Sequence, residues 1–219
     1  MIEIEKTRIY GWEEAIRGMR NPMNSWEKMD TGWVDGFVVP EKDWIGYDSE
    51  SGAVKVIGPN DLSLMQKLVK AGSDHSKFMR MINVTCDITA PLYWWKEYDT
   101  YKVGTVANSC STMHKIHAKE FTLDDFSHEH LAPAVIDHLN ETISVLNFYR
   151  GIYNEDKSKS AWWQMIQLLP SSYNQKRTVQ LNYAVLRNMY HSRKNHKLDE
   201  WHTFCEWVDK LPYAELITQ

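Results

Sequence analysis

The chain has 219 residues, a net charge of −4 at pH 7 and an apolar content of 43%, which is the composition of an ordinary globular protein. Charges of both signs are interspersed, so nucleic acid is not expected as the main partner. The longest apolar run, Ala161–Pro170, is too short to cross a membrane, and the N-terminus has no pattern of a secretory signal. Three widely spaced cysteines (Cys86, Cys110 and Cys205) fit a reducing compartment. These features predict a cytoplasmic protein with no membrane contact.

The first sixty residues predict a mixture of short elements. Trp12–Met19 is expected to be a short helix, followed by a turn-rich segment, Asn21–Asp30. Trp33–Val39 and Ala53–Ile57 alternate in polarity like strands, with Ser51-Gly52 as the turn signal between them.

The next segment predicts a helix, a strand and a second helix. Asn60 resembles the N-cap of a helix that ends at Gly72. Phe78–Ile88 is rich in β-formers and predicts a strand. Pro91 is suited to the first position of an aromatic-rich helix that runs until Gly104.

The C-terminal half predicts four helices. Apolar residues recur at three- and four-residue steps and predict one long helix: Leu131, Val135, Leu139, Ile143, Leu146 and Tyr149. Shorter helices are expected over Ser160–Leu169, Arg177–Arg193 and Leu198–Leu211. The sequence therefore predicts one α+β domain over residues 1–219, with residues 125–219 mostly helical.

The segment Ala90–Lys115 is dense in Trp, Tyr, Asn, Ser and Thr. Aromatic rings stack on a heterocycle, and hydroxyls and amides orient it, so this composition suits a pocket for a flat, phosphate-bearing ligand. Plain core packing is the alternative, and it is expected for at least three of the five aromatic residues. These five residues are Tyr93, Trp94, Trp95, Tyr98 and Tyr101.

A polar set follows about seventy residues downstream. In a helix Arg177–Arg193, Asn182 and Arg193 are about three turns apart and would share a face with apolar neighbours. They would either line a cavity or lie on a partly exposed face, because unpaired burial of such groups is costly.

The order of a strand, a Pro-led aromatic helix, an Asn/Ser-rich turn, a long helix and a helix with spaced Asn and Arg resembles the flavin-dependent thymidylate synthases. In that family a C-terminal helix carries Asn, a second Asn six residues on and Arg five residues later, and this chain has Asn182, Asn188 and Arg193. The resemblance covers roughly Ser73 to Trp201, and the first sixty residues are not matched. It implies a small mixed or antiparallel sheet packed with long helices, and a homotetramer with active sites built between subunits.

The family signature RHR-x-x-S-x-N-E-x-S-x-R-Y is eroded here. Asn108 and Ser111 keep their places, whereas Ser109, Met113 and His114 replace Glu, Arg and Tyr. Where RHR stands in the family, Thr100-Tyr101-Lys102 keeps one positive charge. The loss predicts weaker cofactor binding, a rebuilt phosphate site or a different ligand. Lys96 and Arg80 are the cations that could compensate.

The resemblance also implies ligand contacts. His75-Ser76 resembles a stretch at the FAD site, and the cofactor-binding residues implied in this way are His75, Ser76, Lys102, Asn108, Asn182 and Asn188. The substrate-binding residues implied are Glu97, Ser109, Ser111 and Arg193, with Arg193 on the dUMP phosphate, for which a guanidinium is well suited.

The implied reaction is FAD-dependent methylation of deoxyuridine monophosphate, with NADPH and methylenetetrahydrofolate as co-substrates and no certain catalytic side chain. The protein would position flat rings and neutralise phosphate. Two alternatives stay open: modification of another pyrimidine nucleotide, and a catalytically silent homologue that binds nucleotide or protein.

Three other sites are not expected in this sequence. Cys110 could be a nucleophile, but it falls at a variable position of the signature. The histidine pairs, such as His114 with His117, lack a third ligand at metal-binding spacing, so no metal is expected. A basic cluster that begins at Arg187 is short and is followed by Asp199 and Glu200.

Overall fold

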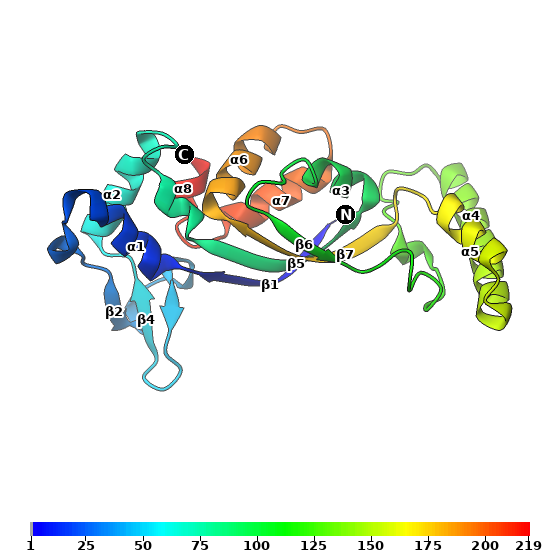
Figure 1. Cartoon of the computed structure of the whole chain (residues 1–219), viewed down its shortest axis with the longest axis horizontal. Coiled ribbons are helices and arrows are strands. Elements are labelled where there is room, and N and C mark those ends of the chain that lie inside the picture. Colours follow the sequence, from blue (N-terminus) through cyan, green and yellow to red (C-terminus); the bar gives the residue numbers. More distant parts are fainter. Residues whose placement is uncertain (1) are drawn as a thin grey trace. The chain divides into compact units, whose positions relative to one another are not determined.

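The computed structural model describes residues 2–219, which form two compact units. Unit 1 comprises Asp87–Thr100 and Ala107–Thr178 together with the start of the chain. Unit 2 comprises Ile4–Cys86, Tyr101–Val106 and Val179–Gln219. The chain is a mixture of small sheets and helices (Figure 1), so the predicted α+β class is confirmed.

Two sheets organise the strands. The first has the order β1-β5-β7-β6, with bounds β1 Glu3–Tyr10, β5 Asn83–Pro91, β7 Asn174–Asn182 and β6 Val106–Ser109. The second has the order β2-β4-β3, with bounds β2 Gly32–Asp35, β4 Ala53–Val56 and β3 Gly46–Tyr47. Both pairings of the second sheet are antiparallel. The turn at Ser51-Gly52 joins β3 to β4, and Gly52 has a positive φ of 71°.

Unit 2 contains the helices at both ends of the chain. They are α1 Trp12–Arg20, α2 Pro59–Lys70, the 3₁₀ helix η5 Lys77–Arg80, α6 Tyr183–Arg193, α7 Asp199–Asp209 and α8 Glu215–Thr218. Helix α6 packs against η5, α7 and α8, and it buries Tyr183, Leu186 and Met189. Gly11, directly before α1, requires glycine, because its φ is 91° and a Cβ there would lie 2.0 Å from the Met81 carbonyl oxygen.

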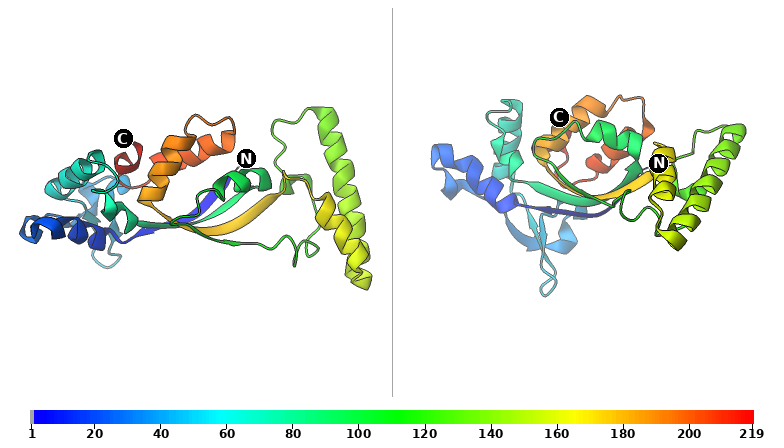
Figure 2. Two further views of the ribbon diagram at one scale, coloured as in Figure 1. Left: turned by 45° about the horizontal axis from the view of Figure 1, so that its top comes forward. Right: turned by 45° about the vertical axis from the view of Figure 1, so that its right-hand side comes forward.

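Unit 1 contains α3 Leu92–Tyr98, α4 Pro133–Asp156 and α5 Lys159–Leu168. Helices α4 and α5 lie side by side as a helical hairpin (Figures 1 and 2), and Lys157 in a left-handed conformation ends α4. The apolar stripe predicted for this helix is confirmed in part, since Leu139, Ile143 and Leu146 are buried. They form a core with four further buried residues: Ile116, Phe121, Phe126 and Met165.

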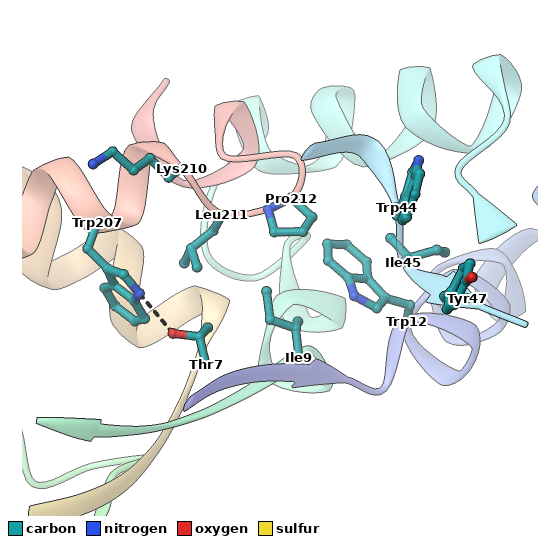
Figure 3. A pocket seen from close by; sticks show the side chains of 11 residues that line it. Thr7, Ile9, Trp12, Trp44, Ile45, Tyr47, Trp207, Lys210, Leu211 and Pro212 are labelled. Carbon is teal, nitrogen blue, oxygen red and sulfur yellow. Dashed lines mark hydrogen bonds between the residues drawn. The ribbon is translucent and has the colours of Figure 1, made fainter. Parts of the chain in front are cut away.

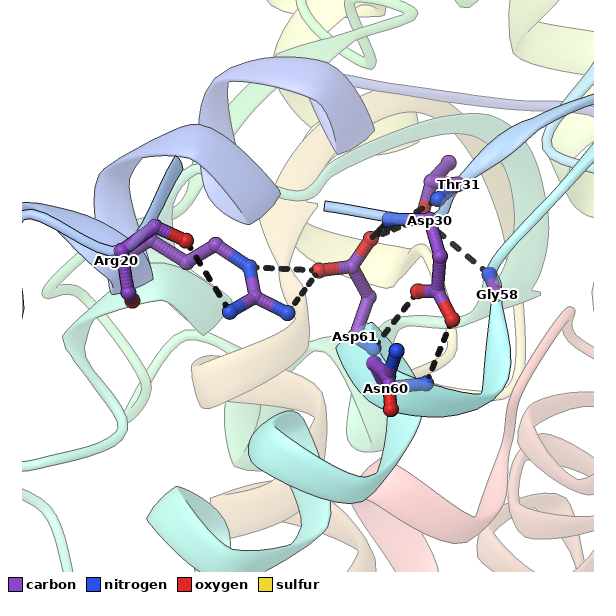
Figure 4. A network of polar contacts seen from close by, with 7 residues as sticks. Arg20, Asp30, Thr31, Gly58, Asn60 and Asp61 are labelled. Atoms are coloured by element: carbon purple, nitrogen blue, oxygen red, sulfur yellow. Dashed lines mark hydrogen bonds and ion pairs between the residues drawn. The ribbon is translucent and has the colours of Figure 1, made fainter. Parts of the chain in front are cut away.

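A buried ionic network connects α1, α2 and the segment before β2 (Figure 4). Arg20 and Asp61 are 4% and 0% exposed, and the Arg20 Nε and Nη2 atoms both lie 2.7 Å from one Asp61 carboxylate oxygen. The other oxygen accepts hydrogen bonds from the backbone N–H groups of Asp30 and Thr31 and from the Thr31 hydroxyl. The Asp30 carboxylate in turn caps α2 by accepting from the N–H groups of Asn60 and Asp61.

Several predicted boundaries are wrong. Helix α2 begins at Pro59 with Gly58 as N-cap, so Asn60 is not its cap. Phe78–Ile88 is not one strand, because η5 precedes β5. The aromatic helix ends at Tyr98 rather than Gly104.

The most consequential error concerns Arg177–Arg193, which is the end of β7 followed by α6. Val179 and Leu181 are buried and Thr178 and Gln180 are exposed, which is the two-residue alternation of a strand. The C-terminal half is therefore less helical than predicted.

Candidate functional site

Helix α6 in unit 2 and its N-cap supply the three residues whose spacing suggested a ligand site. Asn182 is its N-cap, and its side-chain oxygen accepts a 3.1 Å hydrogen bond from the Val185 N–H. Because Asn182 precedes the helix with φ −132° and ψ 168°, it does not share a helical face with Arg193, and that prediction is wrong.

The segment Tyr101–Val106 lies against α6. Gly104 has a φ of 80°, and a Cβ there would lie 3.2 Å from the Asn182 amide nitrogen and 3.0 Å from Val185. Lys102, the remaining cation of the eroded signature, is exposed in this segment. The close approach at Gly104 therefore places Asn182 beside the segment that replaces RHR.

Arg193, in the last turn of α6, is held by aromatic rings. Its Nε donates a 2.8 Å hydrogen bond to the Tyr101 hydroxyl, and its guanidinium carbon lies 5.4 Å and 5.0 Å from the ring centroids of Tyr101 and Trp201. Such cation–π contacts restrict the guanidinium without removing its charge. Arg193 is thus a half-buried cation in a fixed position.

The other side of α6 faces a cavity of about 440 Å³. Ser76, in the loop between α2 and η5, and Asn188 both line it, so the structure brings these two predicted cofactor-binding residues together. His75 is exposed and is not among the lining residues. Asn182 and Arg193 do not line this cavity either. Of the three spaced residues, Asn188 lies at the cavity, whereas Asn182 and Arg193 lie beside the segment Tyr101–Val106.

Two arginines line the same cavity. Arg80 comes from η5 and is one of the two cations expected to compensate for the lost signature arginines; its compensating role stays a prediction. Arg187 comes from α6 and was not predicted. It donates hydrogen bonds to the carbonyl oxygens of Ile217 and Gln219. Burial lowers the pKa of Arg187, but arginine starts so high that the side chain stays charged at neutral pH.

His191 also lines this cavity, and its Nε2 lies 3.1 Å from the Ile217 carbonyl oxygen. His191 lies four residues after Arg187 and three after Asn188, so it is one turn further along α6 on the same side. This spacing is the signal in the sequence that could have grouped Arg187 and His191 with Asn188.

The remaining predicted site residues belong to unit 1. Asn108 and Ser109 lie on β6 with exposed side chains. The Ser111 hydroxyl accepts hydrogen bonds from the N–H groups of Met113 and His114, so it stabilises a turn. Glu97 is half-buried on α3. No ligand role of these residues is tested by the geometry, and each stays a prediction.

The turn around Cys110 is fixed to β7. The Cys110 N–H donates to the Lys176 carbonyl at 2.9 Å, and the Gln175 amide donates to the Cys110 carbonyl at 2.7 Å. Cys110 is exposed, and it is one of three free cysteines. The backbone here holds the turn, and nothing around it singles out the thiol as a nucleophile.

Most of the aromatic residues of the signature region form core, as expected. Trp94, Trp95 and Tyr98 are at most 2% exposed. Arg177 lies 4.1 Å from the Trp95 ring centroid and pairs with Asp99 at 2.8 Å. These three rings are therefore not available as walls of a pocket.

Residues 2–219 contain no group of three His, Cys, Asp or Glu side chains that could hold a metal ion. Over the same residues, no helix has both the length and the apolar character needed to cross a membrane.

Comparison with solved structures shows the fold of the flavin-dependent thymidylate synthases. A structure of thymidylate synthase X from Helicobacter pylori with FAD and dUMP has a TM-score of 0.66 at 15% identity, over 100% of this chain and 97% of that one. A second structure of this flavin-dependent enzyme, also with FAD and dUMP, has the same TM-score and identity and covers 98% and 97%. No family model and no curated protein matches the sequence.

Proposed function

We propose that this protein binds FAD and methylates deoxyuridine monophosphate, with methylenetetrahydrofolate as methylene donor and NADPH as reductant. The observation that carries the proposal is the cavity lined by Ser76, Asn188, Arg80 and Arg187, in a chain with the fold of enzymes solved with FAD and dUMP. The proposal includes the homotetramer that the resemblance implies.

The donor set of the cavity fits an anionic cofactor. Two guanidinium groups supply charge, and a hydroxyl and a carboxamide supply neutral hydrogen bonds. Arg80 and Arg187 would hold the diphosphate, taking over the charge that the signature lacks at Met113. The cofactor supplies the hydride chemistry when bound.

Arg193 is proposed to bind the nucleotide phosphate. The fork of donors on a guanidinium matches phosphate oxygens, and the contacts with Tyr101 and Trp201 fix the orientation of the group before the nucleotide arrives. Asn182 caps the N-terminus of α6 and lies against Gly104, so its proposed role is to position α6 relative to the segment Tyr101–Val106.

The test is a titration of purified protein with FAD, followed by flavin fluorescence and absorbance. We expect binding, with Arg80→Ala and Arg187→Ala each weakening it about tenfold, as expected for a charge-assisted hydrogen bond. Lys70→Ala, an exposed cation at the end of α2, is the matched control and leaves binding unchanged.

The substrate is tested in the same preparation. Titration with dUMP and with dCMP, read from the flavin spectrum, followed by an assay of thymidylate formation, separates the two nucleotides. Preference for dCMP would support modification of another pyrimidine nucleotide. A protein that cannot be loaded with FAD would refute both flavin functions and leave the silent homologue.

A further inference from the structure

Unit 2 contains a second, larger cavity of about 480 Å³ that shares no lining residue with the one proposed for FAD (Figure 3). It lies between β1, the segment around β3, and the end of α7. Its walls are mainly aromatic and aliphatic, and Lys210 is the charged residue among those that line it within the described chain.

One end of this second cavity is an aromatic platform. The rings of Trp44 and Tyr47 are nearly parallel, with an interplanar angle of 8° and centroids 5.8 Å apart. The Trp44 indole is fixed by a 3.0 Å hydrogen bond to the Val39 carbonyl. Tyr47 is 60% exposed, so this pair is not core packing, and it can accept a further ring by offset stacking.

The other end holds Trp207 and Lys210 (Figure 3). The Trp207 indole N–H donates a 3.0 Å hydrogen bond to the Thr7 hydroxyl, which fixes its ring. Lys210 follows α7 directly and is exposed, so its flexible stem leaves the ammonium group at the rim.

Aliphatic side chains connect the two ends. Ile9 and Thr7 point the same way from β1, as residues two apart on a strand do, and Leu211 and Pro212 face them (Figure 3). Trp12 is 3% exposed and forms the buried floor. The cavity is therefore elongated and apolar in its middle, with rings at both ends and a cation at one of them.

We propose that this second cavity binds an elongated aromatic anion. Its ring system lies on Trp44 and Tyr47, and its carboxylate, sulfonate or phosphate pairs with Lys210. A planar ring gains apolar burial and stacking at the platform, while a cation as the charged residue among apolar lining residues favours a negative group over a neutral or positive one.

The experiment uses 8-anilinonaphthalene-1-sulfonate as the aromatic anion and N-phenyl-1-naphthylamine as its neutral counterpart, each followed by fluorescence on the full chain. We expect Tyr47→Ala and Trp44→Ala to weaken both probes about tenfold. We expect Lys210→Ala to weaken the sulfonate about fivefold and to leave the neutral probe unchanged. Circular dichroism checks that each variant is folded, and Tyr47→Ala is the safer variant because that ring is largely exposed.

Matched controls separate this cavity from exposed apolar surface. Trp163→Ala and Phe37→Ala remove rings that are 41% and 99% exposed elsewhere on the chain, and both should leave the sulfonate affinity unchanged. Arg80→Ala, which alters the cavity proposed for FAD, should also leave the sulfonate affinity unchanged, because the two cavities share no residue. Equal weakening by the control variants or unchanged affinity in Tyr47→Ala would each overturn the proposal.

Discussion

At the scale of single residues, Tyr101 is predicted to position Arg193 for a nucleotide phosphate. Tyr101→Phe removes the hydroxyl that accepts from Arg193 Nε and keeps the ring beneath the guanidinium. We expect the Kd for dUMP to rise about tenfold, the effect of one hydrogen bond to a charged group. Isothermal titration calorimetry on the FAD-loaded protein measures it.

Arg193→Ala should weaken dUMP more than Tyr101→Phe does, because it removes the cation itself. Lys197→Ala, an exposed cation four residues further along, serves as the control and should not change the Kd. An unchanged Kd in Arg193→Ala would contradict the assigned phosphate role.

The three cysteines are predicted to differ in reactivity. Cys110 is exposed, whereas Cys86 is 2% and Cys205 6% exposed, and burial raises the pKa of the Cys205 thiol to about 11. Because the thiolate is the reactive form, iodoacetamide at mildly alkaline pH should modify Cys110 alone in the folded protein. Peptide mass spectrometry identifies the site.

Cys110→Ser should then retain thymidylate formation, since the backbone of this residue rather than its thiol makes the contacts with β7. A variant that binds FAD and dUMP normally but forms no product would restore the nucleophile hypothesis.

The sequence could predict the residues of α6 better than their geometry. The spacing of Asn182, Asn188 and Arg193 singled out the segment Arg177–Arg193, although its first six residues belong to β7, and the structure brings Asn188 to Ser76. It could not show that Asn182 is a cap, because capping depends on where β7 ends. It also could not show that Arg193 is held by Trp201, because that contact depends on how α7 folds back on α6.

At the scale of elements, the network around Asp61 is predicted to hold α1 and α2 together. Asp61→Asn leaves Arg20 as a buried cation without its carboxylate, and we expect a loss of about 3–5 kcal/mol in the free energy of unfolding. Chemical denaturation measures it. Asp74→Asn, on the exposed loop after α2, is the control and should change stability by less than about 0.5 kcal/mol.

The difference in the free energy of unfolding between wild type and Asp61→Asn should become smaller at acidic pH. Burial raises the pKa of Asp61, but hydrogen bonds from Thr31, Arg20 and the backbone outweigh it, so the pKa in the folded protein lies below the ordinary value. The stabilisation is therefore fully present above the unfolded pKa of about 3.9 and is lost as pH falls through the lower folded value. Wild type and Asp61→Asn should converge at low pH, and a constant difference would contradict this assignment.

Elements with an unambiguous period could be predicted from the sequence. The apolar residues of α4 and of the short amphipathic α1 recur with a helical period only, so each segment predicts a helix and no strand. In contrast, the segment from Arg177 combines a strand alternation with a helical spacing, and neither pattern decides between them. Strand β1 was missed because its burial does not alternate along most of its length.

At the scale of the whole molecule, the chain retains the fold although most residues of the signature motif are replaced. The chain keeps the architecture of flavin-dependent thymidylate synthases over its full length at 15% identity. Core positions need only apolar side chains of suitable volume, so many sequences satisfy them. A phosphate site needs particular charges, but a guanidinium can reach it from another element, as we propose for Arg80 in the cofactor cavity.

The predicted site residues are divided between the two units, with Asn108 in unit 1 and Arg193 in unit 2. If active sites are built between subunits, as the resemblance implies, Asn108→Ala and Arg193→Ala should each be inactive alone but complement one another in mixed oligomers. When equal amounts of the two variants assemble at random, about a quarter of the sites contain both intact residues. Thymidylate formation should then reach about a quarter of the wild-type rate. The assay follows denaturation and joint refolding of the two variants, with separately refolded variants mixed only at the end as the control. Refolded wild type that shows a tetramer by light scattering, together with variants that do not complement, would place both residues of one site on the same chain.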